Sequence, residues 1–106
     1  MFLASTTVAT KAEAEALATL IISENHAACV QIDGPILSLY GWNGKIERSE
    51  EFRLLVKCVE AQLPGLERCV LSQHPYETPE WIVVRADSVG EKYLSWAKAN
   101  STNPPL

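Results

Sequence analysis

The sequence predicts a single α+β domain: a ferredoxin-like βαββαβ sandwich with a long hairpin between the second and third strands and an extra C-terminal helix. Two observations lead to this fold class. Strand-like segments and segments of helical periodicity follow one another in that order along the chain. An Asn-Gly pair, Asn43-Gly44, joins two long strand-like runs. Because 106 residues provide only one core, residues 1–100 are expected to form one domain.

The first strand and the first helix are predicted from residues 2–24. Residues 2–8 are β-branched and apolar, as in a strand. Thr10 and Glu13 then have the spacing of a capping box, in which the threonine hydroxyl accepts from the Glu13 amide and the Glu13 carboxylate reaches back to the Thr10 amide. Asn25 suits a left-handed position after the last helical residue, so the helix is expected to end near Glu24.

The second and third strands, residues 28–42 and 45–59, are predicted to form a hairpin. Asn43-Gly44 favours a type I′ turn, which places Trp42 opposite Lys45 and Tyr40 opposite Glu47. Proline cannot donate to a strand ladder, so Gly34-Pro35 predicts a bend or bulge in the second strand.

This hairpin is expected to be longer than the core that carries it. About 14 residues at about 3.3 Å each give an arm near 45 Å, whereas a domain of this size has a radius of gyration of about 13 Å. Leu39, Tyr40 and Trp42 near the tip then need cover from another copy of the chain. The alternative is a shorter hairpin that breaks at Pro35 and curls back.

The second half of the chain is expected to contain a helix, a loop and a strand. Pro64 suits the first turn of a helix that runs to about Ser72. Residues 73–80 form a loop with two prolines. Residues 81–86 are almost continuously apolar, which predicts a fourth strand covered on both faces.

The chain closes with a predicted helix over residues 90–100, which presents Tyr93, Leu94 and Ala97 on one side. Paired prolines in residues 101–106 forbid helix and ladder, so this segment is expected to be a flexible tail.

Composition excludes several functional classes. Nine Lys and Arg against 13 Asp and Glu give a net charge of −4, which is unfavourable for nucleic acids and anionic membranes. Three scattered cysteines, at 29, 58 and 69, and no visible targeting signal indicate reduced, buried thiols in the cytoplasm. No phosphate loop, nucleophile elbow or metalloprotease motif is present, so an enzyme is not expected.

Residues 74–80 carry the most unusual chemistry. Two prolines stiffen a segment that holds an imidazole, a phenol and two carboxylates. His74 with Glu77 or Glu80 can offer nitrogen and oxygen ligands to a divalent metal. In the alternative interpretation Tyr76 packs inward, His74 hydrogen-bonds to the backbone and the carboxylates are solvated.

Other polar groups are interpreted structurally. His26 and Cys29 are expected in a turn and a strand rather than as ligands. The charged residues of the third strand are expected to be a solvated edge or to form salt bridges between chains; they are Glu47, Arg48, Glu50 and Glu51.

Separated motifs in this order resemble the CutA family of divalent cation tolerance proteins. They are Ala27-Ala28-Cys29-Val30, Gly34-Pro35-Ile36, Tyr40-Gly41-Trp42-Asn43-Gly44-Lys45-Ile46-Glu47 and His74-Pro75-Tyr76-Glu77-Thr78-Pro79-Glu80, with Tyr93-Leu94-Ser95-Trp96 in the closing helix. The resemblance implies a homotrimer similar to the PII signalling proteins. It also implies copper or divalent-cation tolerance, with proposed ligands at an early cysteine and two adjacent histidines. Thr6, Gln73 and His74 stand at these positions here.

Two functions are compatible with this resemblance. In the first, a metal-responsive trimer binds copper or another divalent cation weakly through His74 and Glu77, without an organic cofactor. In the second, a PII-like module without a metal role binds a small ligand or a partner protein in clefts between subunits. The residues expected to line such a cleft are Tyr40, Trp42, Tyr76 and Glu80. A trimeric scaffold without a small ligand is a third interpretation.

Overall fold

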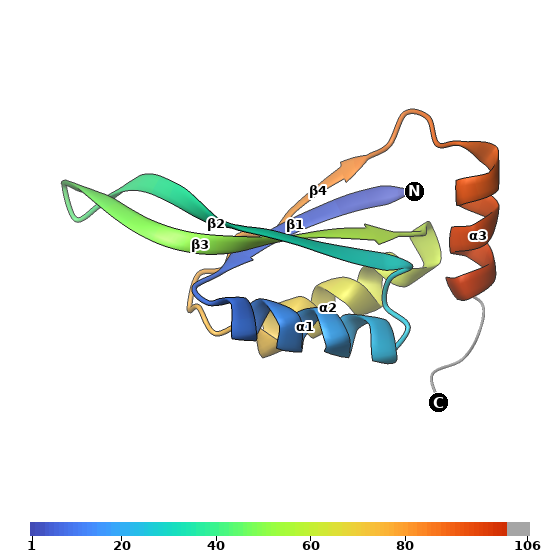
Figure 1. Ribbon diagram of the computed structural model, residues 1–106, viewed down its shortest axis with the longest axis horizontal. Helices are drawn as coiled ribbons and strands as arrows, with labels where there is room; N and C mark the ends of the chain where they lie inside the picture. The colour runs from blue at the N-terminus through green and yellow to red at the C-terminus, as the bar shows by residue number, and fades with distance from the viewer. Residues whose placement is uncertain (102–106) are drawn as a thin grey trace.

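A computed structural model describes residues 1–101 as one antiparallel four-stranded sheet, with the first two helices on one face and the C-terminal helix at one end (Figure 1). The elements are β1 (Phe2–Val8), α1 (Lys11–Ser23), β2 (Cys29–Trp42), β3 (Lys45–Cys58), the 3₁₀ turn η1 (Glu60–Gln62), α2 (Leu63–Gln73), β4 (Ile82–Arg85) and α3 (Glu91–Ser101). The strand order is β2-β3-β1-β4. The predicted α+β, ferredoxin-like fold class with its long hairpin and C-terminal helix is therefore confirmed. None of the helices in residues 1–101 has the length and apolar character needed to cross a membrane.

The first helix begins and ends as its sequence predicts. The Glu13 amide donates to Oγ1 of Thr10 over 3.1 Å, which caps α1. The Thr10 hydroxyl in turn donates to Oε1 of Glu13 over 2.9 Å, so the glutamate meets the hydroxyl rather than the Thr10 amide. Asn25 has a φ of 59°, the left-handed conformation expected of it. These local bonds fix the end of α1 that faces β1.

The hairpin has its full predicted length, because β2 and β3 each contain 14 residues. Asn43 and Gly44 have φ values of 51° and 74°, as a type I′ turn requires. Trp42 pairs with Lys45 in the predicted register. The register shifts between Asp33 and Ile36, where the Gly34-Pro35 peptide bond is cis. The curled alternative is wrong, and the part beyond the shift, residues 36–51, is called the arm below.

The arm leaves the body of the protein on the side opposite α3 (Figure 1). The longest dimension of the molecule is 46 Å against 30 and 21 Å for the other two. β1 supports β3 only as far as the pair Val8–Phe52, so the arm is a ribbon of two strands.

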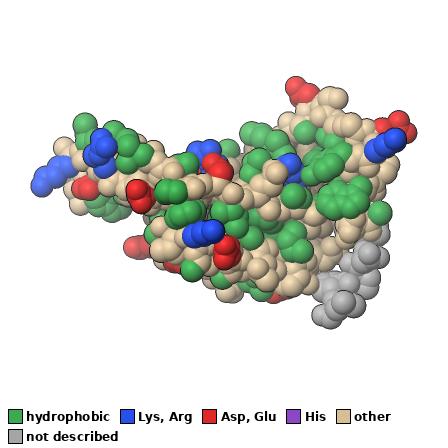
Figure 2. Space-filling model, in the orientation of Figure 1, with side chains coloured by type: hydrophobic (Ala, Val, Ile, Leu, Met, Phe, Trp, Pro, Cys, Tyr) green, Lys and Arg blue, Asp and Glu red, His purple; other side chains and the backbone are tan. Residues whose placement is uncertain are grey.

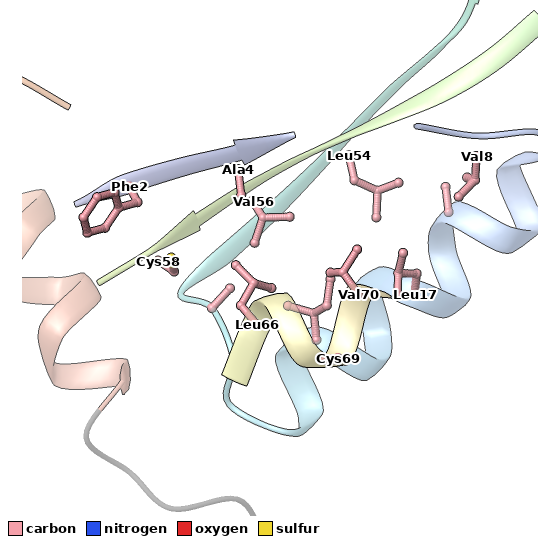
Figure 3. Packing of buried hydrophobic residues seen from close by; sticks show 13 residues of the cluster. Phe2, Ala4, Val8, Leu17, Leu54, Val56, Cys58, Leu66, Cys69 and Val70 are labelled. Carbon is pink, nitrogen blue, oxygen red and sulfur yellow. The ribbon is translucent and has the colours of Figure 1, made fainter. Parts of the chain in front are cut away.

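The core fills the space between the sheet and the pair α1 and α2 (Figure 3). Leu54 and Val56 of β3 point toward Leu66 and Val70 of α2, and all four are fully buried. The buried Cys58 and Cys69 complete this layer as small apolar side chains, as predicted. Leu17 and Ile21 bring α1 into the same cluster. The core therefore holds β1 and β3 in the centre of the sheet, next to the base of the arm.

The prediction that the fourth strand is covered on both faces is wrong, because in a single chain one face of this strand is exposed. β4 is an edge strand, and Ile82 and Val84 are 55% and 52% exposed. The helices α1 and α2 lie on one face of the sheet, and of the predicted strand Trp81 and Val83 pack against the core. The apolar run of β4 therefore reflects a face that this chain alone leaves open.

The closing helix contacts the body through its apolar side. Ala97 is fully buried and Leu94 is half-buried, whereas Tyr93, expected on the same side, and Trp96 remain exposed. Their rings pack on each other with centroids 5.5 Å apart. α3 includes Ser101, and the rest of the predicted tail, residues 102–106, lies outside the described residues.

Candidate functional site

The loop of residues 74–80 connects α2 to β4 and folds back onto the end of β1. Nε2 of His74 lies 2.9 Å from the main-chain oxygen of Thr7 and 3.0 Å from Oγ1 of Thr6. Nδ1 of His74 accepts from the Tyr76 amide over 3.0 Å. Because a carbonyl only accepts, these partners assign the proton to Nε2 and the lone pair to Nδ1. The alternative in which His74 hydrogen-bonds to the backbone describes this arrangement.

Tyr76 joins the loop to the arm. Its ring packs on that of His74 with centroids 5.0 Å apart, and its hydroxyl donates to Oε2 of Glu51 over 3.0 Å. Burial raises the pKa of Tyr76 most, and the hydrogen bond to Glu51 and the negative charge of Glu51 raise it further, to about 12. The phenol therefore stays a hydrogen-bond donor at any ordinary pH.

The charges of this cluster respond to partial burial and to each other. Burial acts to raise the pKa of Glu51, but hydrogen bonds with Ser38, Tyr76 and Thr7 outweigh it, so that the pKa is below its usual value. Burial lowers the pKa of His74, although the Thr7 carbonyl and the carboxylates of Glu13 and Glu51 oppose the change. A neutral imidazole and an ionised Glu51 are thus the favoured states near neutral pH.

Glu80 fastens the other end of the loop. Its Oε2 accepts from the Ser5 hydroxyl over 2.9 Å, and its main-chain oxygen accepts from Oγ1 of Thr6 over 2.7 Å. The buried Thr6 therefore contacts both ends of the loop, His74 and Glu80. A hydroxyl at position 6 thereby ties the loop to the central strand.

The structure brings some of the predicted site residues together and leaves others apart. His74 and Tyr76 are in contact, Tyr40 is near enough to Tyr76 to influence its pKa, and Glu80 joins them through Thr6. Trp42 is at the hairpin tip and 60% exposed. None of Tyr40, Trp42, Tyr76 and Glu80 lines either of the two hollows described below. Their role in a cleft between subunits stays a prediction.

The two proposed metal ligands, His74 and Glu77, have no third ligand beside them in residues 1–101. Glu77 is exposed, and its side chain makes no hydrogen bond or ion pair with the rest of residues 1–101. In that part of the chain no three His, Cys, Asp or Glu side chains are close enough to share a metal ion. His26 instead contacts Glu24, with Nε2 and Oε2 3.5 Å apart. One chain thus fits a divalent cation poorly, and a tight site needs ligands beyond those of one chain.

Glu51, Thr7 and Ser38 were not anticipated from the sequence. The expectation that Glu51 belongs to a solvated edge is wrong, because the side chain is half-buried and accepts hydrogen bonds. No local pattern marks it: its partners come from β1, β2 and the returning loop, which only the fold brings together. The predicted register was the one signal that places Glu51 near the bulge.

Among the hollows of residues 1–101, two lie on the helical side of the molecule. The larger, of about 720 Å³, lies between α1 and α2 and is remote in sequence from the arm; His26, Arg68 and Cys69 are among its lining residues. The smaller, of about 210 Å³, borders the loop at Gln73 and Pro75. Gln73, which precedes His74, lines both hollows, and Pro75 of the loop lines the smaller one.

Comparison with known proteins assigns this architecture to a family. The family model described as CutA1 divalent ion tolerance protein matches residues 2–100. The chain belongs to the CutA1 family. The divalent-cation tolerance protein CutA of Escherichia coli (strain K12 / DH10B) is 36% identical over 90 residues, which cover 85% of this chain and 80% of that protein. The protein of the same name from Shigella boydii serotype 18 matches equally.

Solved CutA structures have the same fold. CutA from Synechococcus elongatus PCC7942 superimposes with a TM-score of 0.91 at 37% identity, over 95% of this chain and 89% of that chain. CutA1 from Oryza sativa gives a TM-score of 0.90 at 37% identity, over 94% and 92%. CutA1 from Ehrlichia chaffeensis reaches 0.93 at 22% identity over 96% and 95%, a likeness of fold alone.

Proposed function

We propose that this member of the CutA1 family acts in divalent cation tolerance as a cytoplasmic homotrimer without catalytic activity. In the proposed trimer, copper or another divalent cation binds weakly through His74 and Glu77. The names of its relatives support a role in cation tolerance. The single observation that carries the assembly is the arm, whose apolar side chains have no cover in one chain.

The arm exposes large apolar side chains on a ribbon of only two strands (Figure 2). Trp42 is 60% exposed and Ile46 is 78% exposed, and Leu37 and Leu39 are more than half exposed. A hairpin with this composition is marginal in water by itself. Burial of these side chains against another copy stabilises both the arm and the assembly.

A second bare apolar surface lies on the open face of the sheet. Side chains alternate along strands, so the residues next to those of the core point to this face. Leu3 pairs with Val84 across β1 and β4, and Ser5 lies between Leu55 and Ile82. Figure 2 shows further hydrophobic side chains near β4 and α3. Two separate apolar surfaces suit a closed ring, in which each subunit uses one surface on each neighbour.

The cation affinity is expected to be low for a structural reason. Nε2 of His74 is bonded to Thr7 and Nδ1 to the Tyr76 amide. A cation that takes either nitrogen has to displace a hydrogen bond. Of the two loop carboxylates, Glu80 already accepts from the Ser5 hydroxyl, which leaves Glu77 as the further ligand. Each hydrogen bond displaced costs about 1 kcal/mol, which subtracts from the binding free energy.

Sedimentation equilibrium tests the assembly. The wild-type chain should give a mass about three times 11.7 kDa. Ile46→Ser removes an exposed apolar side chain from the arm and should shift the equilibrium toward monomers. Ile22→Ser, on the solvent side of α1, is the matched control and should leave the trimer intact. A monomeric wild-type protein at micromolar concentration would contradict the proposal.

One observation favours the second candidate function. Both nitrogens of His74 are already engaged, which suits a PII-like module that binds a small ligand or a partner protein at its clefts without a metal. A melting-temperature screen separates the two functions, since a ligand at 100 times its dissociation constant adds about 2.7 kcal/mol. A shift with nucleotides or other anions but not with Cu²⁺ supports the second function. A shift with Cu²⁺ that is lost in His74→Ala supports the first.

A further inference from the structure

Support for the hairpin from the rest of the sheet stops at one level. β1 pairs with β3 up to Val8 and Phe52 and no further. At the same level the β2–β3 register shifts between Asp33 and Ile36. The next residue of β3 is Glu51, the first residue of the arm on that strand. At this point the β2–β3 ladder is irregular and β1 no longer pairs with β3. A rotation of the arm against the body is therefore easiest here.

Glu51 is also the residue that the loop holds. The Tyr76 hydroxyl donates to Oε2 of Glu51 over 3.0 Å, and the side chains of Ser38 and Thr7 lie close enough to the same carboxylate to lower its pKa. Ser38 belongs to the arm, while Thr7 belongs to the end of β1. The carboxylate thus joins both strands of the arm to the body, immediately beyond the irregular position.

Tyr76 is itself held firmly enough to transmit this restraint. Its amide donates to Nδ1 of His74, whose Nε2 donates to the main-chain oxygen of Thr7. Thr6 then binds the far end of the loop at Glu80. An unbroken series of hydrogen bonds therefore leads from β1 through the loop to the arm.

We propose that Tyr76 and Glu51 are a positioning pair that fixes the direction in which the arm leaves the sheet. The lever is long: residues 36–42 extend about 23 Å at 3.3 Å per residue, so a rotation of 10° at the base moves the tip by about 4 Å. A displacement of this size separates side chains that would otherwise be in contact. The pair consequently controls assembly, a consequence that rests on the proposed homotrimer.

Hydrogen exchange with mass spectrometry tests the pair in the full-length protein. Tyr76→Phe deletes one hydroxyl and keeps the ring, and amides of residues 36–51 should then exchange about fivefold to tenfold faster. Amides near Leu54 and Val56, which β1 supports, should accelerate less than those of the arm. Tyr93→Phe is the matched control, because it deletes the same group from α3, on the side of the molecule opposite the arm, and it should behave as wild type.

Further variants separate positioning from simple destabilisation. Glu51→Ala should reproduce the faster exchange of the arm, and the double variant Tyr76→Phe/Glu51→Ala should add little to it. Should Tyr76→Phe not fold, Glu51→Ala provides the same comparison with the loop unaltered. Equal arm exchange in wild type and Tyr76→Phe, or acceleration spread equally over the arm and the core, overturns the inference.

The two proposals fail in different ways. A monomeric wild-type protein contradicts the homotrimer, yet exchange in the arm still reports on Tyr76 and Glu51. In a trimeric protein, Tyr76→Phe should raise the dissociation constant of assembly about tenfold while the wild-type mass remains that of a trimer. An unchanged dissociation constant together with faster arm exchange would confirm the positioning pair and limit its role to the isolated arm.

Discussion

Gly34 lies directly against the phenyl ring of Phe52. A β-carbon at Gly34 would be 2.7 Å from Cδ2 of the ring and 3.0 Å from the main-chain oxygen of Glu51. The φ of Gly34 is +152°, a value that residues other than glycine rarely adopt. The bulge at the base of the arm thus depends on a residue without a side chain, because a half-buried ring and a backbone oxygen occupy the space.

Gly34→Ala should therefore destabilise the fold. Strain in the backbone and the clash with Phe52 are expected to lower the free energy of unfolding by about 2 kcal/mol, measured by urea denaturation. Gly41→Ala is the matched control, because nothing lies within 4 Å of the added carbon. Equal stabilities of the two variants would show that the ring of Phe52 moves aside at little cost.

Glu51→Gln should reveal a pH-dependent contribution of this carboxylate. The folded-state pKa of Glu51 is below its usual value of 4.5, so the ionised form favours the folded state. The contribution is complete above the unfolded-state pKa and is lost as the pH falls through the folded-state pKa. At about pH 7 the variant should be less stable by about 1 kcal/mol, a value already reduced for solvent screening. The difference should shrink below pH 4.5, and thermal melts of both proteins at several pH values measure it.

The three thiols should react in a fixed order. Cys58 has no exposed surface, and burial raises its pKa to about 11. Burial, and then the nearby Glu24, raise the pKa of Cys69. A disulfide reagent at neutral pH should therefore label the half-buried Cys29 first, and the other two only in denaturant. Rapid labelling of folded Cys29→Ser would contradict this order.

Copper titration by calorimetry tests the proposed ligands. His74→Ala and Glu77→Gln should each weaken binding at least about tenfold, which corresponds to the loss of one of few ligands. His26→Ala is the matched control, since this histidine contacts Glu24 and lies at the far end of α1 from the loop. Identical isotherms for wild type and His74→Ala would remove His74 from any cation site.

The fold follows from the sequence where local chemistry decides. The Thr10 cap, the left-handed Asn25 and the Asn43-Gly44 turn each have a short-range cause, and the structure confirms all three. The turn also sets the register, which is why the pair Trp42–Lys45 was correctly placed. The prediction for β4 failed because an uninterrupted apolar run does not reveal whether the residues that cover the strand belong to the same chain.

The site was predicted less completely. The loop of His74 and Tyr76 was located from its composition, because prolines around an imidazole and a phenol are unusual. Its partner Glu51 was assigned to solvent, because it stands in a charged run and meets Tyr76 across 25 positions of sequence. A carboxylate in such a run acquires its partners from tertiary structure, for which sequence spacing carries no signal.

The place of β1 in the sheet also sets an order of events during synthesis. β1 is a central strand, yet Phe2 finds its partners only at Cys58 and Arg85. Both strands of the hairpin are complete at residue 58, so a nascent chain can pair them while the central strand still lacks one neighbour. Until Arg85 has left the ribosome, such a chain has a paired hairpin, but β1 still lacks its neighbour β4. Polysomes bring several such hairpins close together, so pairing between different chains is most favourable during synthesis.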